Sequence, residues 1–188
     1  MSQRLQFFII TGDPGVGKTT LVKRLSSLLN NSNIKTVGFY TEEIRKNRIR
    51  EGFDVVTLDG TRGPLARDQS LLSGPIKHKV GKYGVLLQEF ENVALPTLKQ
   101  EDTQSCLVID EIGKMEFFSE PFKSRIKEIF SPNSNHIVLA TIPVRRGDQL
   151  IEFIRHNSKA KVWMVTRENR NIIHEDILQE IKIAFNVK

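Results

Sequence analysis

The distribution of apolar residues along the chain predicts strands that alternate with helices. Short apolar runs bounded by polar or turn residues are typical of buried strands, and they cover Leu5–Thr11, Lys35–Tyr40, Cys106–Ile109, Ile137–Thr141 and Val162–Val165. Apolar residues at helical spacing follow most of these runs, over Thr19–Leu29, Phe90–Leu98, Pro121–Phe130, Asp148–His156 and Asn171–Phe185. Pro96 is unfavourable for a regular helix in the second of these segments. The alternation predicts an α/β fold in which helices cover both faces of a mainly parallel sheet, with a ligand at the carboxyl ends of the strands.

The segment from Tyr40 to about Gln88 departs from this alternation. Glu51–Gly60 alternates imperfectly and ends in Asp-Gly, which is a turn signal, and Val80–Leu87 is also typical of a strand. Gly, Pro, Arg and Ser are frequent in Thr61–Arg67 and Leu72–Lys79, which we predict to be loops. We therefore expect antiparallel strands here that extend one edge of the sheet.

Length and composition indicate a single domain over residues 1–188. The chain is 39% hydrophobic, which is ordinary for a globular protein, and no apolar run approaches the roughly 20 residues that span a bilayer. The first apolar run leads directly into a turn motif rather than into a cleavage site, so we expect no signal peptide. Cys106 is the only cysteine, which excludes an internal disulfide and indicates a reducing compartment. We expect an intracellular, cytoplasmic protein, and the nucleus is equally compatible with these arguments.

The formal net charge of +6 is concentrated in the first 50 residues, which carry nine Lys and Arg against three Asp and Glu. A basic half of this kind suits a polyanionic ligand such as a nucleotide. Nucleic acid would be a second possible partner, but aromatic residues are not interleaved with the basic ones in any recognisable binding module. We therefore interpret most of the charge as solvated surface and expect neither nucleic acid nor a membrane as a partner.

The strongest chemical signal is the sequence G-D-P-G-V-G-K-T over Gly12–Thr19, which matches the phosphate-binding loop. It lies between a predicted strand and a predicted helix, so main-chain N–H groups and the positive helix end would face phosphate oxygens. Lys18 would reach the β- and γ-phosphates, and the Thr19 hydroxyl would bind Mg²⁺. The alternative is a Gly- and Pro-rich turn before a surface helix. The nucleotide-binding residues predicted here are Gly12, Asp13, Pro14, Gly15, Val16, Gly17, Lys18, Thr19 and Thr20.

A second group of candidates directly follows the predicted strand Cys106–Ile109. At the exposed carboxyl end of a buried strand, Asp110 would hold Mg²⁺ directly or through water, and Glu111 would orient the attacking water. The alternative is that both are solvated loop charges, or that Glu111 caps a helix. Lys114 could stabilise negative charge that develops on the γ-phosphate, or it could be a surface lysine. Glu116 could pair with Lys114 or face solvent.

Two later strand ends contribute further candidates. Thr141 could hydrogen-bond the attacking water or the γ-phosphate, which makes it a candidate nucleotide contact. Arg145 and Arg146 could approach the nucleotide, although solvated arginines are the simpler interpretation. Thr166–Asn169 occupies the place where guanine-specific switch proteins carry N-K-x-D, and no Asp stands in the corresponding slot. This difference predicts loose selection of the base.

Other reactive residue types carry weaker signals. His78, His136, His156 and His174 lack the spacing of a zinc site, and Cys106 is better explained as a small buried residue than as a nucleophile. Trp163 alternates within an apolar strand and is predicted to lie in the core.

Several motifs together resemble the cancer-related nucleoside-triphosphatase family. They are G-D-P-G-V-G-K-T-T-L from Gly12, G-F-Y-T-E-E-I-R over Gly38–Arg45, G-F-D-V-V-T-L-D-G-T-R-G-P-L over Gly52–Leu65, V-I-D-E-I-G-K-M-E over Val108–Glu116 and A-T-I-P over Ala140–Pro143. The resemblance implies a three-layer, RecA-like P-loop NTPase fold. It also implies slow, Mg²⁺-dependent hydrolysis of ATP, GTP, CTP and UTP to diphosphate and phosphate.

The resemblance assigns the family's phosphate loop to Gly12–Thr19 and its acidic pair to Asp110 and Glu111. Asp13 departs from the small or proline residue of some relatives and adds a negative charge near the phosphates. The resemblance gives no role to Glu42, Glu43 or Arg45, which we expect in a loop near the nucleotide.

Four functions compete at this point. A nucleoside-triphosphate hydrolase that acts as a monomer is the leading hypothesis, with Lys18, Glu111 and Lys114 as the catalytic residues and Thr19 and Asp110 as Mg²⁺ ligands. A small-molecule kinase would need an acceptor pocket, which the loops at Thr61–Arg67 and Leu72–Lys82 could form. A nucleotide-dependent switch would change its affinity for a partner with the state of the nucleotide. A nucleic-acid-stimulated ATPase would show turnover that depends on RNA or DNA and falls with salt.

Overall fold

Nine strands form one mixed sheet in the described part of the chain. A computed structural model of the chain describes residues 4–99 and 104–187. The strands lie in the order β5-β6-β4-β3-β2-β7-β8-β1-β9. Their bounds are β1 Phe7–Thr11, β2 Thr36–Lys46, β3 Ile49–Thr57, β4 Arg62–Asp68, β5 Lys79–Val80, β6 Tyr83–Val85, β7 Cys106–Ile109, β8 Ile137–Thr141 and β9 Ala160–Met164.

The half of the sheet that carries the predicted site is parallel. Strands β2, β7, β8, β1 and β9 pair in parallel, and β8 lies between β7 and β1. All five residues of β1 are buried, and they alternate between two hydrophobic cores, one on each face of the sheet. Ile109 pairs with Ala140, and Ile10 pairs with Thr141. The carboxyl ends of β7, β8 and β1 therefore meet at the same edge.

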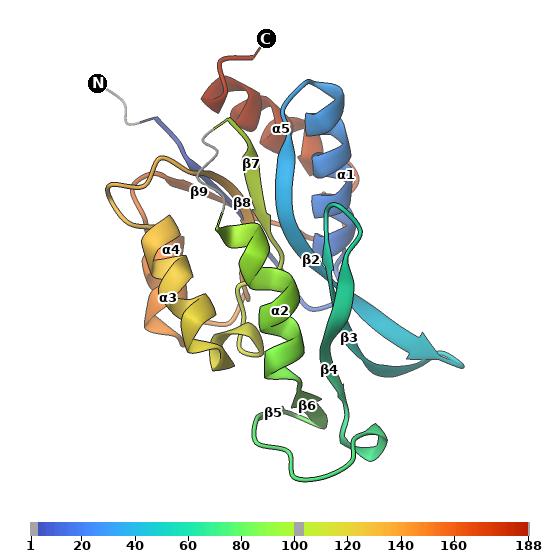
Figure 1. The fold of residues 1–188 in the computed structure, drawn as a ribbon. Helices are drawn as coiled ribbons and strands as arrows, with labels where there is room; N and C mark the ends of the chain where they lie inside the picture. Colours follow the sequence, from blue (N-terminus) through green and yellow to red (C-terminus); the bar gives the residue numbers. More distant parts are fainter. Residues whose placement is uncertain (1–3, 100–103, 188) are drawn as a thin grey trace.

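Helices cover both faces of the parallel half, as the sequence predicts (Figure 1). Helices α1 Lys18–Asn31 and α5 Ile173–Ala184 pack on one face, and α2 Leu87–Leu98, α3 Glu120–Ile129 and α4 Gln149–Arg155 pack on the other. The α1 residues Leu21, Leu25 and Leu29 recur at intervals of four and are all buried. On the opposite face, the ring of Phe39 contacts those of Phe90 and Phe122 at centroid distances of 6.0 and 6.1 Å. The predicted three-layer α/β architecture is confirmed.

None of the described helices is both long and apolar enough to cross a lipid bilayer.

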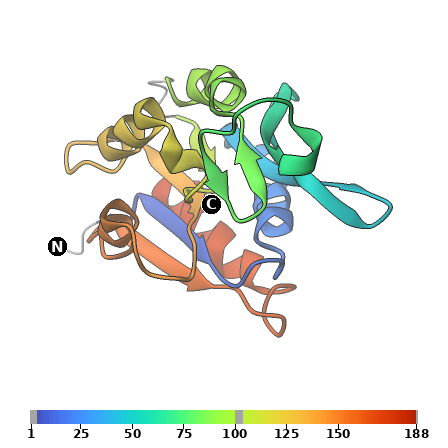
Figure 2. The same ribbon diagram turned by 90° about the horizontal axis from the view of Figure 1, so that it is seen from below.

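The predicted antiparallel extension of the sheet is also present. Strand β2 continues to Lys46, beyond the end of its partner β7, and then pairs in antiparallel fashion with β3. Strands β4, β6 and β5 add to the same side, each antiparallel to its neighbour. The tip of the β2–β3 hairpin projects away from the body of the molecule in both views (Figures 1 and 2).

One predicted loop in this region is a strand. Thr61–Arg67 forms most of β4, and the Gly and Pro residues that indicated a loop have packing roles there. Helix α2 lies so close to Gly63 that a Cβ atom at this position would be 2.8 Å from Val93 Cγ2. Pro64 pairs with Asp54 beside a register shift, which is a position where strands tolerate proline.

One predicted strand is three elements. Val80–Leu87 contains the end of β5, a turn, β6 and the first residue of α2. Gly81 has φ of +57° and turns the chain between the two short strands. Helix α2 therefore begins at Leu87 rather than at Phe90, and Pro96 lies inside its last turn.

Candidate functional site

The loop Gly12–Gly17 joins β1 to α1 at the carboxyl edge of the sheet. Gly17 has φ of +111° and precedes the first residue of α1, so the chain enters the helix through a left-handed conformation that favours glycine. The Lys18 ammonium donates to the carbonyl oxygens of Gly12, at 2.9 Å, and Asp13, at 3.3 Å. The loop is therefore wrapped around a cation at the positive end of a helix, which is an arrangement that binds anions.

A buried carboxyl group joins three elements beside this loop. Asp110 directly follows β7 and is 2% exposed. Thr19 from α1 donates its hydroxyl to Asp110 Oδ2, and Thr141 from β8 donates to Oδ1, both at 2.6 Å. Burial raises the pKa of Asp110, while the hydrogen bonds from Thr141 and Thr19 and the charge of Lys18 oppose that rise. The structure thus brings together three residues that the sequence singled out separately.

The expected role of Thr141 changes in this arrangement. Its hydroxyl donates to Asp110, so Thr141 orients the carboxyl group in the structure. The contact with a water or a γ-phosphate that we expected for Thr141 stays a prediction.

The oxygen atoms of this cluster fit a small hard cation. Thr19 and Asp110 offer a hydroxyl and a carboxylate oxygen that lie 2.6 Å apart, and Mg²⁺ is usually held by one or two such groups together with substrate phosphates and water. In the described part of the chain, no group of three or more His, Cys, Asp or Glu residues is placed to hold a metal ion. A metal held here would therefore take the rest of its ligands from a bound phosphate and from water.

Glu111 lies next to the same loop. Its Oε2 atom is 3.9 Å from the Lys18 ammonium, and its side chain is 30% exposed. Burial raises the pKa of Glu111, Lys18 lowers it, and the neighbouring Asp110 raises it. A carboxylate that is partly exposed beside the phosphate loop can accept a proton from a water molecule there, as the sequence analysis predicts.

Glu116 is a site residue whose position the sequence analysis missed. It is 4% exposed, so the expectation that it faces solvent or pairs with an exposed Lys114 is wrong. Burial raises its pKa to about 8, and the charge of Glu111 adds to that rise. The turn closed by the bond from Phe117 N to Gly113 O points Glu116 inward. The signal was available, because Glu116 is a single acid flanked by Met115 and Phe117.

Gly113 lies between the two glutamates. A Cβ atom here would be 2.9 Å from Glu111 Oε1 and 3.0 Å from Glu116 Oε2. Only a residue without a side chain allows both carboxyl groups to pack over this position. The segment Asp110–Glu116 thus carries three carboxyl groups that are held close together.

Several other candidates are exposed or lie in strands. Lys114, Arg145 and Arg146 are exposed, and a contact of any of them with the nucleotide stays a prediction. Glu42 lies in β2 rather than in a loop and pairs with Lys23 of α1 and with Arg62. Glu43 and Arg45 pair with each other near the tip of the β2–β3 hairpin, so they too lie in a strand.

The weaker signals have structural explanations. Cys106 is buried, and burial raises its pKa to about 12, which is unfavourable for a nucleophile. Trp163 is 7% exposed and donates its ring N–H to Asp176 at 2.5 Å. His78 packs against the ring of Phe118 at 4.8 Å.

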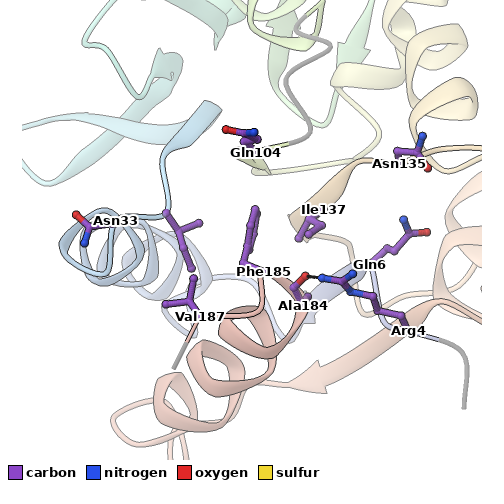
Figure 3. A pocket seen from close by; sticks show the side chains of 10 residues that line it. Arg4, Gln6, Asn33, Gln104, Asn135, Ile137, Ala184, Phe185 and Val187 are labelled. Carbon is purple, nitrogen blue, oxygen red and sulfur yellow. Dashed lines mark hydrogen bonds between the residues drawn. The ribbon is translucent and has the colours of Figure 1, made fainter.

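A pocket of about 490 Å³ lies at the opposite edge of the sheet (Figure 3). Its lining includes Gln6, which precedes β1, and Ile137, which begins β8. No predicted site residue lines this pocket. The chemistry described above therefore belongs to the carboxyl edge.

The chain is similar to known proteins in both sequence and fold. A family model described as NTPase matches residues 7–178. The chain is similar to the cancer-related nucleoside-triphosphatase of Homo sapiens, with 48% identity over 178 residues that cover 90% of this chain and 93% of the relative. It is 39% identical to the nucleoside-triphosphatase THEP1 of Thermotoga maritima over 175 residues, which cover 93% and 94% of the two chains.

Two solved structures share the fold. The crystal structure of THEP1 from Aquifex aeolicus has a TM-score of 0.79 at 39% identity, covering 92% of this chain and 96% of that one. The solution structure of a human cancer-related nucleoside triphosphatase has a TM-score of 0.79 at 44% identity, covering 95% and 98%.

The burial of Glu116 predicts a pH dependence of stability. Between the ordinary glutamate pKa of 4.5 and the folded value of about 8, folding takes up a proton at Glu116, so stability falls as pH rises. The slope is at most about 1.4 kcal/mol per pH unit. Urea unfolding of wild type and Glu116→Gln between pH 5 and pH 8.5 would measure the difference, and we expect the variant to lack this part of the decline.

Glu120→Gln is the matched control, because Glu120 is exposed at the start of α3. Equal pH slopes in wild type and Glu116→Gln would contradict the prediction and would mean that Glu116 ionises like an ordinary glutamate.

Proposed function

The chain belongs to the NTPase family whose family model matches residues 7–178. We propose that it hydrolyses nucleoside 5′-triphosphates to diphosphate and phosphate. The proposal includes Mg²⁺ dependence, slow turnover and acceptance of ATP, GTP, CTP and UTP alike. The observation that carries it is the position of Glu111, whose carboxyl lies 3.9 Å from the ammonium that the phosphate loop encloses. An acceptor for the proton of water thus stands beside the place where phosphates bind.

The phosphate loop, Lys18 and Glu111 have different roles in the proposed in-line displacement. Main-chain N–H groups of Gly15–Thr19 and the Lys18 ammonium hold the phosphate chain. Glu111 orients a water molecule and accepts its proton as the oxygen attacks the γ-phosphorus, while the bond to the bridging oxygen breaks and the diphosphate leaves. Lys18 stabilises the negative charge on the transferring group.

Asp110 and Thr19 would hold the metal ion in this proposal. Mg²⁺, when bound, would neutralise charge on the β- and γ-phosphates. Thr141 orients Asp110, because its hydroxyl fixes one carboxylate oxygen, and a contact of Thr141 with the nucleotide stays a prediction. Glu116, neutral at pH 7, avoids a third negative charge beside Asp110 and Glu111.

The small number of cations near Glu111 supports slow turnover. Among residues 4–99 and 104–187, Lys18 is the one cation within ion-pairing distance of Glu111. An arginine finger can contribute roughly 10³–10⁵ in rate, so a site that lacks one should be slow. Lys114 stays a candidate for part of this role.

The proposal also covers the organisation of the active unit. One sheet carries both the parallel and the antiparallel strands, which supports a single domain over residues 1–188. The proposed active unit is a monomer that needs no nucleic acid for turnover. A cytoplasmic location fits the buried free thiol of Cys106.

The central prediction concerns phosphate release from ATP, GTP, CTP and UTP with Mg²⁺. Lys18→Ala should lower the rate roughly 10²- to 10³-fold, because it removes the cation in the loop. Glu111→Gln should lower kcat roughly 10²- to 10⁴-fold and keep nucleotide binding, because the amide cannot accept the proton. Lys127→Ala, an exposed change on α3, is the control. Tight binding by wild type without phosphate release above the Lys18→Ala background would overturn the proposal and direct the search toward a kinase acceptor or a switch partner.

A second prediction concerns the packing of Glu111 over Gly113. Gly113→Ala should lower kcat roughly 10- to 100-fold, because the new methyl group displaces the Glu111 and Glu116 carboxyl groups. Gly147→Ala is the matched control, since nothing lies within 4 Å of a Cβ there. Equal rates in the two variants would mean that the position of Glu111 does not limit turnover.

A further inference from the structure

The order of the strands gives the phosphate loop two different sides. Asp110 and Glu111 follow β7, and Thr141 ends β8, so all three lie on one side of the loop that follows β1. Strand β9 lies on the other side. If hydrolysis occurs beside the acids, as the proposed function states, the γ-phosphate lies on the β8 side. The nucleoside end of the substrate then lies toward β9.

The segment that follows β9 reaches the phosphate loop. Arg170 Nη1 donates to the carbonyl oxygen of Val16 at 3.4 Å, and its Cδ lies 3.9 Å from the position of a Cβ on Gly17. Arg24 of α1 donates to Asn171 O at 3.4 Å, which ties the same segment to the helix. Figure 2 shows the loop after β9 next to the loop that precedes α1.

Polar side chains of this segment are occupied by bonds within it. Asn169 Oδ1 accepts from Thr166 N at 2.8 Å, and Asn169 Nδ2 donates to Met164 O at 2.9 Å. Thr166 Oγ1 accepts from Asn169 N at 3.3 Å. Thr166 also hydrogen-bonds Glu168. The polar side chains of Thr166, Glu168 and Asn169 are thus used to hold the loop.

The side chain of Arg170, unlike those of Thr166, Glu168 and Asn169, does not bond within the loop that follows β9, which the structure describes in full. It is exposed, and among the described residues no carboxylate lies within ion-pairing distance of it. A guanidinium group is flat and weakly hydrated, so it stacks on the face of an aromatic ring. Every nucleobase has such a face, whatever hydrogen-bonding groups it carries on its edge.

We propose that Arg170 binds the nucleobase of the substrate by stacking, and so supplies affinity without selecting among the four bases. This inference rests on the proposed function, because the direction of the phosphate chain depends on where hydrolysis occurs. It gives a physical reason for broad base acceptance, since stacking on the flat guanidinium group of Arg170 does not depend on the hydrogen-bonding groups at the edge of the base.

The test compares the affinities of four nucleotides with that of a ligand that has no base. Equilibrium binding with Mg²⁺ would be measured for ATP, GTP, CTP, UTP and inorganic tripolyphosphate in wild type, Arg170→Met and Arg170→Lys. Arg170→Met should weaken all four nucleotides by a similar factor, roughly five- to thirtyfold, and leave tripolyphosphate within about twofold. Arg170→Lys should not restore nucleotide binding fully, because it keeps the charge and loses the plane. Arg167→Met is the matched control, an exposed arginine of the same loop.

Three results would overturn the inference. A parallel loss of tripolyphosphate binding would make Arg170 a phosphate contact, unchanged nucleotide binding would remove it from the site, and a strong preference of wild type for one base would exclude a contact that ignores base edges. The proposed function fails separately, if wild type binds nucleotides and releases no phosphate.

Discussion

The site at the carboxyl edge of the sheet depends on the hydrogen bonds that the buried carboxyl group of Asp110 accepts. Removing an ionised carboxylate from water is unfavourable unless hydrogen bonds or opposite charge compensate for it. Here Thr19 and Thr141 donate to its two oxygens, and the Lys18 ammonium lies nearby. These donors come from α1 and β8, so the same contacts that stabilise the acid also fix the phosphate loop against the strands. Stability and the geometry of the site therefore rest on one group.

The position of β8 between β1 and β7 explains why this arrangement forms. It brings the end of one strand, Thr141, between the phosphate loop and the acid. It also separates the two ends of a bound substrate, because the acids lie on the β8 side of the loop and Arg170 lies on the β9 side. Gly113 then allows Glu111 and Glu116 to pack together where the acidic segment turns. The site is thus formed at the carboxyl ends of four neighbouring strands, β7, β8, β1 and β9.

Sequence reasoning predicted the buried parallel strands and the chemical motifs because both depend on local patterns. The run Phe7–Ile10 is apolar throughout since both of its faces are covered, and the phosphate loop has a fixed spacing. The β4 strand was missed because Gly63 and Pro64 indicate a loop locally, whereas packing by Val93 and a register shift explain them in the fold. The bond from Thr141 to Asp110 depends on strand order, which no local pattern specifies. The burial of Glu116 depends on a turn, and its local sign in the sequence is the pair of apolar residues that flank it.

The most direct test of the role of Asp110 is the effect of Mg²⁺ on nucleotide affinity in Asp110→Asn. Calorimetric titration with a non-hydrolysable ATP analogue, with and without Mg²⁺, would compare this variant with wild type after urea unfolding has shown that both are folded. The account predicts that Mg²⁺ strengthens binding to wild type and has little effect on binding to Asp110→Asn, because the amide is a poor ligand for the metal. Full Mg²⁺ enhancement in Asp110→Asn would contradict the account and would place the metal on other residues.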